Sequence, residues 1–377
     1  MTGGSEPMAG PAVGDELDLT IGPVAHGGHF VARHEGRVVF VRHALTGERV
    51  RARVTEEPAG GGGRFLRADA IEVFEPSPHR VSAPCALARP DGCGGCDFQH
   101  VEVAEQRRLK TAVVREQLQR LAGIEADVEC EAVPGDDHGL RWRTRMQYVA
   151  LPGGRRGLRK HRSHDVVEVV DCPIEHPDGR VTVGGRPEDP DDAVETVLGR
   201  RFRVAADGFW QVHPGAPRAL VETVLEQLAP RPGERVLDLY AGVGLFSAFL
   251  AGAVGAAGSV VAVESDRRAS AYAAGNLADL PQASVVTDRV DRWLHRGQEP
   301  VDLVVLDPPR AGAKRRIVED IAGLAPRAVA YVACDPAALA RDLAYFAASG
   351  YGLAALRCLD LFPMTHHVEC VALLTSL

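Results

Sequence analysis

Short alternating runs of apolar and polar residues fill the N-terminal part of the chain, and glycines separate them. Each run is long enough for one strand, and the clearest are residues 17–21, 38–41 and 49–54. Turns are expected at Gly27-Gly28, at Thr46-Gly47 and over residues 60–63. Short strands joined by frequent turns are typical of a small barrel. Residues 12–75 are therefore predicted to form a five-stranded, OB-like β-barrel.

The middle of the chain changes pattern several times. Residues 103–121 place leucines and valines at helical spacing with charges between them, which predicts a helix. Residues 165–170 resemble a strand, whereas residues 176–192, rich in glycine, proline and acid, are expected to be a loop or linker. We interpret residues 76–203 as a small central α+β domain, with helix 103–122 packed on the domain that follows.

From Val204 onward, apolar runs of strand length alternate with helical segments. Such an alternation forms an open, doubly wound sheet whose strands are mostly parallel. Residues 204–377 are therefore predicted to be an α/β domain with a Rossmann-like fold, and the protein to be multidomain.

Composition narrows the classes of function. The 377 residues are 45% hydrophobic and 25% charged, which fits a globular protein with several cores. No run approaches the roughly 20 apolar residues of a membrane span, and the first residues lack the pattern of a signal peptide. We therefore expect a cytoplasmic protein with no membrane partner and no obligate protein partner. A net charge of −8 argues against a generally basic nucleic-acid binder but not against a local basic patch.

One segment is locally basic. Residues 141–164 contain seven arginines and Lys160 without any acid. A solvated surface loop is the ordinary explanation of such a run. Trp142 and Tyr148 interleave with the arginines, however, and arginines beside aromatic rings suit phosphate contacts and base stacking. The segment is thus a candidate RNA-binding element, represented by Arg141, Arg143, Arg145, Arg159 and Lys160.

Reactive side chains stand near the ends of predicted strands in the C-terminal domain. Cys334 follows the apolar run 328–333, Asp307 follows the run 301–306, and Glu369 precedes the final run. In an open α/β sheet, ligands bind outside the carboxyl ends of the strands. The three residues are therefore candidate nucleophile, acid and base. Taken singly, a packed cysteine, a turn-capping aspartate and a surface glutamate are the plainer interpretations.

A glycine turn follows the first strand of the same domain. Residues 235–239 fit that strand, and Gly242 and Gly244 then open a helix. Glycines let the backbone turn tightly and approach a ligand, and Glu264 ends the next strand, where an acid can bind a ribose. The turn lacks the third glycine of the dinucleotide fingerprint, so it suits S-adenosylmethionine (SAM) better than NAD. The alternative is a plain structural turn.

Three cysteines fall within twelve residues, with two glycines between the last pair: Cys85, Cys93 and Cys96. A structural zinc or an iron-sulfur cluster needs four ligands, and Cys172 is the best fourth. Spacing alone leaves zinc and iron open. Small buried apolar residues are the expected role of the cysteines in ordinary surroundings, which are Cys130, Cys358 and Cys370.

In this combination, the motifs resemble the RNA uracil-C5 methyltransferase family, in the branch with an N-terminal TRAM barrel and a 4Fe-4S cluster. The resemblance covers nearly the whole chain, and the order of the motifs makes it specific. The motifs are Gly27-Gly28, Phe40-Val41, Gly47-Glu48, Cys93-Gly94-Gly95-Cys96 with Gln99-His100, Phe209-Trp210-Gln211-Val212, Asp238-Leu239-Tyr240 with Gly242 and Gly244, Asp307-Pro308-Pro309-Arg310, Cys334, and Phe362-Pro363 with His367 and Glu369.

The resemblance implies an enzyme that transfers a methyl group from SAM to C5 of a uridine in RNA. Cys334 would add to C6 and turn the base into an enolate, Glu369 would remove the C5 proton, and Asp307 would orient the uracil. SAM would be bound by Gln211, Tyr240, Gly242, Gly244, Glu264, Asp288 and Asp307, and the cluster by Cys85, Cys93, Cys96 and Cys172. Because a barrel with a cluster is similar to the ribosomal-RNA branch, 23S rRNA is the expected substrate, with tRNA as the alternative.

Two positions depart from the family pattern. Leu245 stands where many relatives carry an asparagine that contacts the cofactor, and Asp335 replaces the asparagine usual after the nucleophile. We expect the charge of Asp335 to raise the pKa of the Cys334 thiol.

Two other classes of protein share some of these features. A radical methylthiotransferase also combines a TRAM barrel, a cluster and SAM, but it needs Cys-x3-Cys-x2-Cys, and Cys85 stands eight residues before Cys93. A non-catalytic RNA-binding protein with a degenerate methyltransferase domain is the other alternative, which Cys334 and Glu369 argue against.

Overall fold

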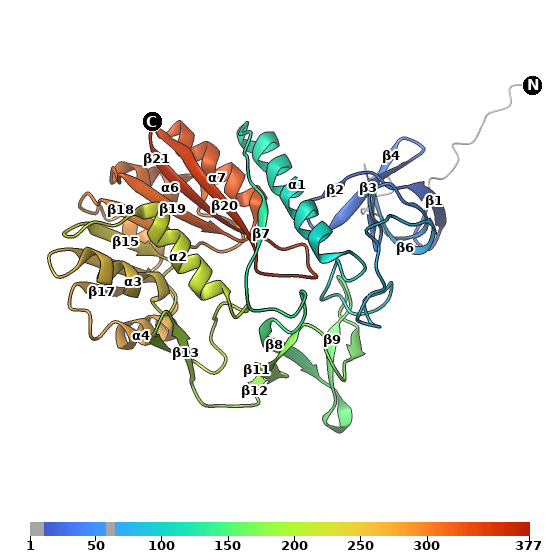
Figure 1. Cartoon of the computed structure of the whole chain (residues 1–377), viewed down its shortest axis with the longest axis horizontal. Helices are drawn as coiled ribbons and strands as arrows, with labels where there is room; N and C mark the ends of the chain where they lie inside the picture. The colour runs from blue at the N-terminus through green and yellow to red at the C-terminus, as the bar shows by residue number, and fades with distance from the viewer. Residues whose placement is uncertain (1–10, 58–64) are drawn as a thin grey trace, which may run out of the picture. The chain divides into compact units, whose positions relative to one another are not determined.

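The computed structural model describes residues 11–57 and 65–377, whose elements are drawn in Figure 1. The chain divides into two compact units. Unit 1 comprises Met1–Glu105, Arg159–Val167 and Met364–His366, and unit 2 comprises Gln106–Leu158, Glu168–Pro363 and His367–Leu377. Residues 1–10 of the N-terminal segment and the turn predicted at residues 60–63 lie outside the described residues.

A six-stranded sheet forms most of unit 1, in the order β1-β5-β6-β4-β3-β2. Its strands are β1 (Glu16–Thr20), β2 (Val24–Ala25), β3 (His29–His34), β4 (Arg37–Arg42), β5 (Arg49–Glu56) and β6 (Phe65–Glu75). The predicted alternation is visible in β5, where Val50, Ala52 and Val54 are buried between exposed or half-buried arginines. Because β2 has only two residues, five strands of ordinary length make up the predicted N-terminal β domain.

A second sheet of five strands forms the central region, in the order β10-β9-β8-β11-β12. Its elements are β8 (Arg143–Ala150), the short helix η1 (Pro152–Gly154), β9 (Arg156–Arg159), β10 (Val166–Glu168), β11 (Glu175–Val183) and β12 (Arg186–Pro187). A separate hairpin follows, made of β13 (Ala193–Val197) and β14 (Arg200–Val204).

The prediction of a loop over residues 176–192 is wrong for β11 and β12. The second half of β11 pairs in parallel with β8, with Val181 opposite Met146 and Val183 opposite Tyr148. The proline and glycine that suggested a loop lie at an irregularity before Arg180, where the register shifts. The valines after this irregularity alternate with polar residues, and this local period matches a strand.

Eight strands form the sheet of the C-terminal region, in the order β17-β16-β15-β18-β19-β21-β20-β7 (Figure 1). They are β7 (Cys130–Ala132), β15 (Arg235–Leu239), β16 (Ser259–Glu264), β17 (Ala283–Thr287), β18 (Leu303–Leu306), β19 (Ala328–Ala333), β20 (Tyr351–Asp360) and β21 (Glu369–Ser376). Strands β15 to β19 pair in parallel, whereas β21 is antiparallel to both β19 and β20. This arrangement confirms the predicted Rossmann-like domain.

Helices cover both faces of this sheet. One face shares a core with α2 (Ala216–Leu228), α3 (Leu245–Val254) and α4 (Arg267–Asn276). The other shares a core with α1 (Val103–Ala122), α5 (Val290–Leu294), α6 (Lys314–Gly323) and α7 (Pro336–Ala348). Val114 and Leu118 bring the predicted helix into this second core. Within the described part of the chain, no helix combines the length and the apolar character needed to span a bilayer.

Candidate active site

The ends of two neighbouring strands bring Cys334 and Glu369 opposite one another. Strands β19 and β21 are antiparallel, and the last pair of their ladder is Ala333 with Cys370. One step further in the same register, Cys334 stands opposite Glu369. Opposite residues of an antiparallel pair project to the same face, with Cβ atoms about 5 Å apart. The register therefore places a thiol beside a carboxylate.

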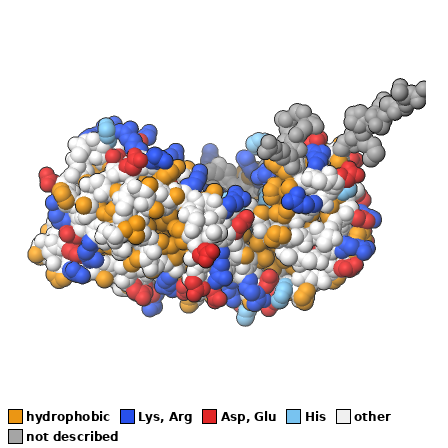
Figure 2. Space-filling view, turned by 90° about the horizontal axis from the view of Figure 1, so that it is seen from above, with side chains coloured by type: hydrophobic (Ala, Val, Ile, Leu, Met, Phe, Trp, Pro, Cys, Tyr) orange, Lys and Arg blue, Asp and Glu red, His pale blue; other side chains and the backbone are white. Residues whose placement is uncertain are grey.

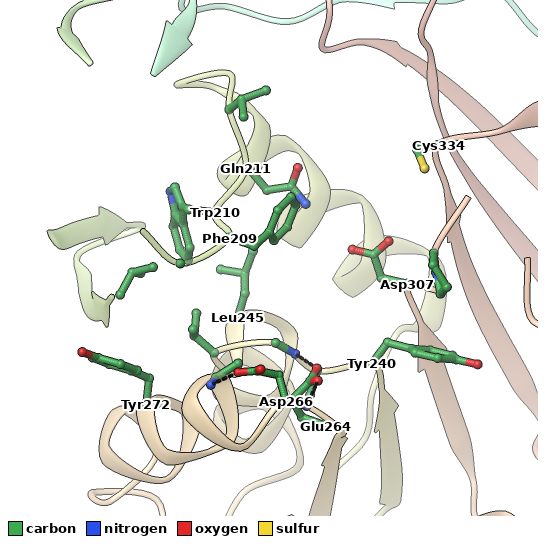
Figure 3. A pocket seen from close by; sticks show the side chains of 18 of the residues that line it. Phe209, Trp210, Gln211, Tyr240, Leu245, Glu264, Asp266, Tyr272, Asp307 and Cys334 are labelled. Atoms are coloured by element: carbon green, nitrogen blue, oxygen red, sulfur yellow. Dashed lines mark hydrogen bonds between the residues drawn. The ribbon is translucent and has the colours of Figure 1, made fainter. Parts of the chain in front are cut away.

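Asp307 reaches the same place from the adjacent strand. It follows β18, which lies between β15 and β19, and its backbone N–H donates to the Leu239 carbonyl at 3.3 Å. Asp307, Cys334 and Glu369 all line one cavity of about 890 Å³, a volume typical of small-molecule sites. Figure 3 shows Asp307 and Cys334 on one side of this cavity, with the Gln211 amide facing them. The structure thus brings the three predicted catalytic residues together.

Burial dominates the electrostatics at this end of the cavity. It raises the pKa of Asp307 to about 7, with a further increase from the charge of Asp238. It also raises the pKa of Glu369 well above the usual value; Asp307 adds to this rise and Arg310 opposes it. The pKa of the Cys334 thiol rises to about 12, first through burial and then through Glu369 and Asp307. The resting nucleophile is therefore a neutral thiol at neutral pH.

Asp335 has a structural role at the start of α7. Its Oδ1 accepts a hydrogen bond from the Ala338 N–H at 2.7 Å and so caps the first turn of α7. From the sequence, the charge of Asp335 is expected to raise the pKa of the Cys334 thiol. The larger causes are burial and the two carboxylates in the cavity.

The glycine turn forms the opposite end of the cavity. The Gly242 N–H donates to Glu264 Oε2 at 2.9 Å, and the Asp266 N–H donates to Oε1 at 2.6 Å. Behind the turn, buried Asp238 accepts from the backbone N–H of Ser247 at 2.8 Å and so satisfies one N–H of the first turn of α3. These bonds fix the turn and orient the Glu264 carboxylate. Among the predicted cofactor residues, those that line the cavity are Gln211, Tyr240, Gly242, Glu264 and Asp307.

Two predicted cofactor residues are not among the described lining residues, namely Gly244 and Asp288. Gly244 adopts a left-handed conformation with φ of 87° and shapes the turn. Asp288 forms ion pairs with Arg292 at 3.3 Å and with Arg296 at 2.8 Å. Three residues that follow Glu264 in the chain and that the sequence reasoning missed also line the cavity: Asp266, Arg268 and Tyr272. Figure 3 shows Asp266 and Tyr272. Their only sequence signal is their place just after the acid at the end of β16.

Several arginines of the basic segment are neutralised by acids from elsewhere in the chain. Arg141 makes a two-pronged ion pair with Asp171, with both distances 2.8 Å. Arg145 pairs with Glu195 at 3.4 Å. On the face seen in Figure 2, basic and acidic side chains are interspersed. Arg143, by contrast, lines the cavity.

Three of the four cysteines predicted to bind a metal belong to unit 1, namely Cys85, Cys93 and Cys96. The Gly95 N–H donates to Cys93 Sγ and the Gln99 amide donates to Cys96 Sγ, both at 3.4 Å. Over residues 11–57 and 65–377, no three His, Cys, Asp or Glu side chains form a group able to hold a metal ion. The four-cysteine metal site therefore stays a prediction. The cysteines expected to be buried are buried: Cys130, Cys358 and Cys370.

Two family models match separate segments of the chain, and related proteins match nearly all of it. Residues 12–71 match the TRAM domain, and residues 218–348 match a family described as conserved hypothetical protein 95. An uncharacterized RNA methyltransferase of Streptomyces avermitilis is 45% identical over 96% of this chain and 98% of its own length. An uncharacterized RNA methyltransferase of Bifidobacterium longum is 35% identical over 96% of this chain and 97% of its own length. The crystal structure of Pyrococcus abyssi tRNA (uracil-54, C5)-methyltransferase with S-adenosyl-L-homocysteine has a TM-score of 0.71 at 21% identity, and the match covers 95% of this chain and 100% of that one.

The fold is thus that of a methyltransferase with a Rossmann-like domain, a central sheet and an N-terminal TRAM domain. The chain belongs to the family of RNA methyltransferases that the Streptomyces and Bifidobacterium proteins represent.

Alkylation of Cys334 by iodoacetamide should be slow at pH 9, because only the thiolate reacts and the pKa of this thiol is about 12. Glu369→Gln removes a negative charge that raises this pKa, so alkylation should become about three- to tenfold faster. The rate is measured on the Cys334 peptide by mass spectrometry. Glu234→Gln, a change just before the amino end of β15 and so away from the carboxyl ends of the parallel strands, should leave the rate unaltered. Equal rates in the wild type and in E369Q would contradict the assigned electrostatics.

Proposed function

We propose that this protein transfers a methyl group from SAM to C5 of a uridine in RNA. The observation that carries the proposal is the presence of Cys334, Asp307 and Glu369 in one cavity with the glycine turn. The names of the relatives support RNA as the substrate. The name of the Pyrococcus protein, whose fold is similar, supports C5 of uracil as the target and SAM as the donor.

The glycine-turn end of the cavity fits SAM chemically. A Cβ at Gly242 would meet no atom within 4 Å, so the backbone is open to a ligand there. The Glu264 carboxylate, fixed by two backbone N–H groups, suits the hydroxyls of a ribose. We assign SAM binding to Gln211, Tyr240, Gly242, Glu264 and Asp307, with Asp266 and Tyr272 as additional lining residues. When bound, SAM supplies an electrophilic methyl group to the carbon that attacks it.

Cys334 supplies the activation that uracil C5 needs. Its sulfur bonds to C6 while the thiol proton passes to the Asp307 carboxylate, so that the Glu369 carboxylate stays ionised, and the C5=C6 electron pair moves into an enolate. Asp307 orients the edge of the base. Once C5 carries the methyl group, Glu369 removes the C5 proton, and the C–H electron pair restores the double bond as Cys334 leaves as a thiolate. The raised pKa of Glu369 makes it a stronger base than an exposed glutamate.

Arg143 and Phe209 are the residues we assign to the substrate RNA near the cavity. Arg143 lines it, and Phe209 lines it although this residue is 75% exposed. A target base must leave its stack to reach a buried nucleophile, and an exposed aromatic ring and an arginine suit a base and a phosphate. The other basic residues of the segment remain candidates for contacts with more distant phosphates: Arg141, Arg145, Arg159 and Lys160.

Cys334→Ala should abolish release of tritium from RNA that contains 5-tritiated uridine, because C5 stays unreactive without the bond at C6. Binding of RNA and of SAM should stay within about twofold, since the thiol contributes little to either. Cys130→Ala, which removes a thiol from β7 at the edge of the same sheet, should still release tritium. Release by C334A, or no release by the wild type, would contradict the proposal.

We infer that the substrate is 23S rRNA, because a TRAM barrel with a cysteine cluster resembles the ribosomal-RNA branch of the family. In a strain that lacks the gene, one 5-methyluridine should disappear from 23S rRNA while tRNA keeps all of its own. Nucleoside mass spectrometry of the two RNA fractions measures this. Loss of 5-methyluridine from tRNA alone would favour the tRNA alternative.

We also propose a 4Fe-4S cluster on Cys85, Cys93, Cys96 and Cys172. Sequence spacing supports it, and so do the donors aimed at the sulfurs of Cys93 and Cys96, since hydrogen bonds to sulfur are typical of cluster surroundings. Protein purified without oxygen should contain about four iron and four sulfide per chain, and Cys93→Ser should contain less. Cys130→Ala should keep the full content. Zinc in place of iron would contradict the proposal.

A further inference from the structure

The loop that leads to Glu369 passes through both units. Residues 361–368 connect β20 to β21. Phe362 and His367 line the cavity in unit 2. The three residues Met364–His366 between them belong to unit 1. The middle of the loop is therefore held by a part of the chain that takes no part in the cavity.

Hydrogen bonds from one short segment hold these three residues. The backbone N–H groups of Asp97 and Phe98 both donate to the Met364 carbonyl at 2.9 Å. The backbone N–H of His366 donates to Asp97 Oδ2 at 3.1 Å, and His366 Nδ1 lies 2.6 Å from the same oxygen. Met364 and Thr365 are buried. We call the Asp97–His366 pair the clasp.

Packing leaves the clasp little freedom. A Cβ placed on Gly28 would lie 2.7 Å from the His366 Cβ, which is closer than van der Waals contact allows. Gly28 also has a φ of +75°, where L side chains are strained. Glycine at this position therefore lets the His366 side chain pack directly against the backbone of Gly28 within unit 1.

In the sequence, the clasp residue His366 is close to Glu369, which lines the cavity. Two residues separate His366 from Glu369, so about 10 Å of extended backbone joins them at most. The first of the two is His367, whose Nε2 lies 3.4 Å from Arg310 Nη2 in the cavity. His366 is thus joined through one peptide bond to His367, which contacts Arg310, the cation that opposes the raised pKa of Glu369.

The other end of the loop has its own anchor. Lys110 Nζ lies 2.5 Å from Asp360 Oδ1 and 3.0 Å from the Phe362 carbonyl, and both charged side chains are buried. Lys110 therefore fixes the loop before the cavity, and the clasp fixes it just before Glu369.

We propose that Asp97 and His366 are positioning residues for proton abstraction from C5. This inference rests on the proposed function. The clasp sets where the Glu369 carboxylate stands, whereas Cys334 stands at the end of β19 and does not belong to the loop. Loss of the clasp should therefore slow removal of the C5 proton more than formation of the bond between Cys334 and C6.

His366→Ala separates the two steps in a single-turnover experiment with SAM and RNA that contains 5-tritiated uridine. Release of tritium should slow about ten- to a hundredfold, as a misplaced catalytic group does. The denaturant-resistant complex of protein and RNA should form within about twofold of the wild-type rate and then accumulate. His366→Asn, whose amide can donate to Asp97, should restore most of the release. Asp97→Ala should match H366A, and the double variant should be no slower than the slower single variant.

Glu48→Gln is the matched control, because Glu48 is another buried carboxylate of unit 1. It accepts hydrogen bonds from the N–H groups of Leu45 and Ser77 and from Arg80, all away from the loop. It should leave the ratio of tritium release to complex formation at the wild-type value. Equal slowing of both steps in H366A, or no change in either, would overturn the clasp. If the wild type forms no complex and releases no tritium, the proposed function itself fails, and this inference fails with it.

Discussion

The antiparallel register of β19 and β21 is the constraint on which the active site depends. Side chains alternate between the two faces of a strand, so a slip of one residue would turn the Glu369 carboxylate away from Cys334. Apolar packing on both faces opposes such a slip. Val332 and Val371 belong to the core on one face, and Tyr331 belongs to the core on the other. The position of the thiol opposite the carboxylate is therefore held by two hydrophobic cores, one on each face of the sheet.

The same burial creates the chemistry of the cavity. Removal from water raises the pKa of Asp307, Glu369 and Cys334 together; Asp307 adds to the rise of Glu369, and both carboxylates add to the rise of Cys334. Acidic groups buried this way do not stabilise a fold, which is why they are usual at functional sites and rare elsewhere. Arg310 opposes the shifts of both Glu369 and Cys334. Arg310 also contacts His367, so its positive charge lies beside the loop that contains the clasp residue His366.

The sequence could predict those residues of the site that directly follow a strand. Asp307 and Cys334 follow apolar runs, and the carboxyl ends of parallel strands meet at one edge of a sheet. Glu369 begins its strand, so it reaches that edge only because β21 is antiparallel, and no local pattern gives the direction of a strand. The ion pairs of the Asp288 carboxylate with Arg292 and Arg296 could not be read from the sequence either, because they depend on how the chain folds after β17. Contacts between distant segments, such as Asp97 with His366, leave no periodic signal at all.

The central claim is that Cys334 forms a transient bond to C6 of a uridine. RNA carrying 5-fluorouridine tests it most directly, because fluorine cannot leave as a proton does and the bonded complex persists. Peptide mass spectrometry of that complex should place the nucleotide on Cys334, and only when SAM is present. A stable complex on another cysteine, or no complex with an RNA that the protein binds, would contradict the account.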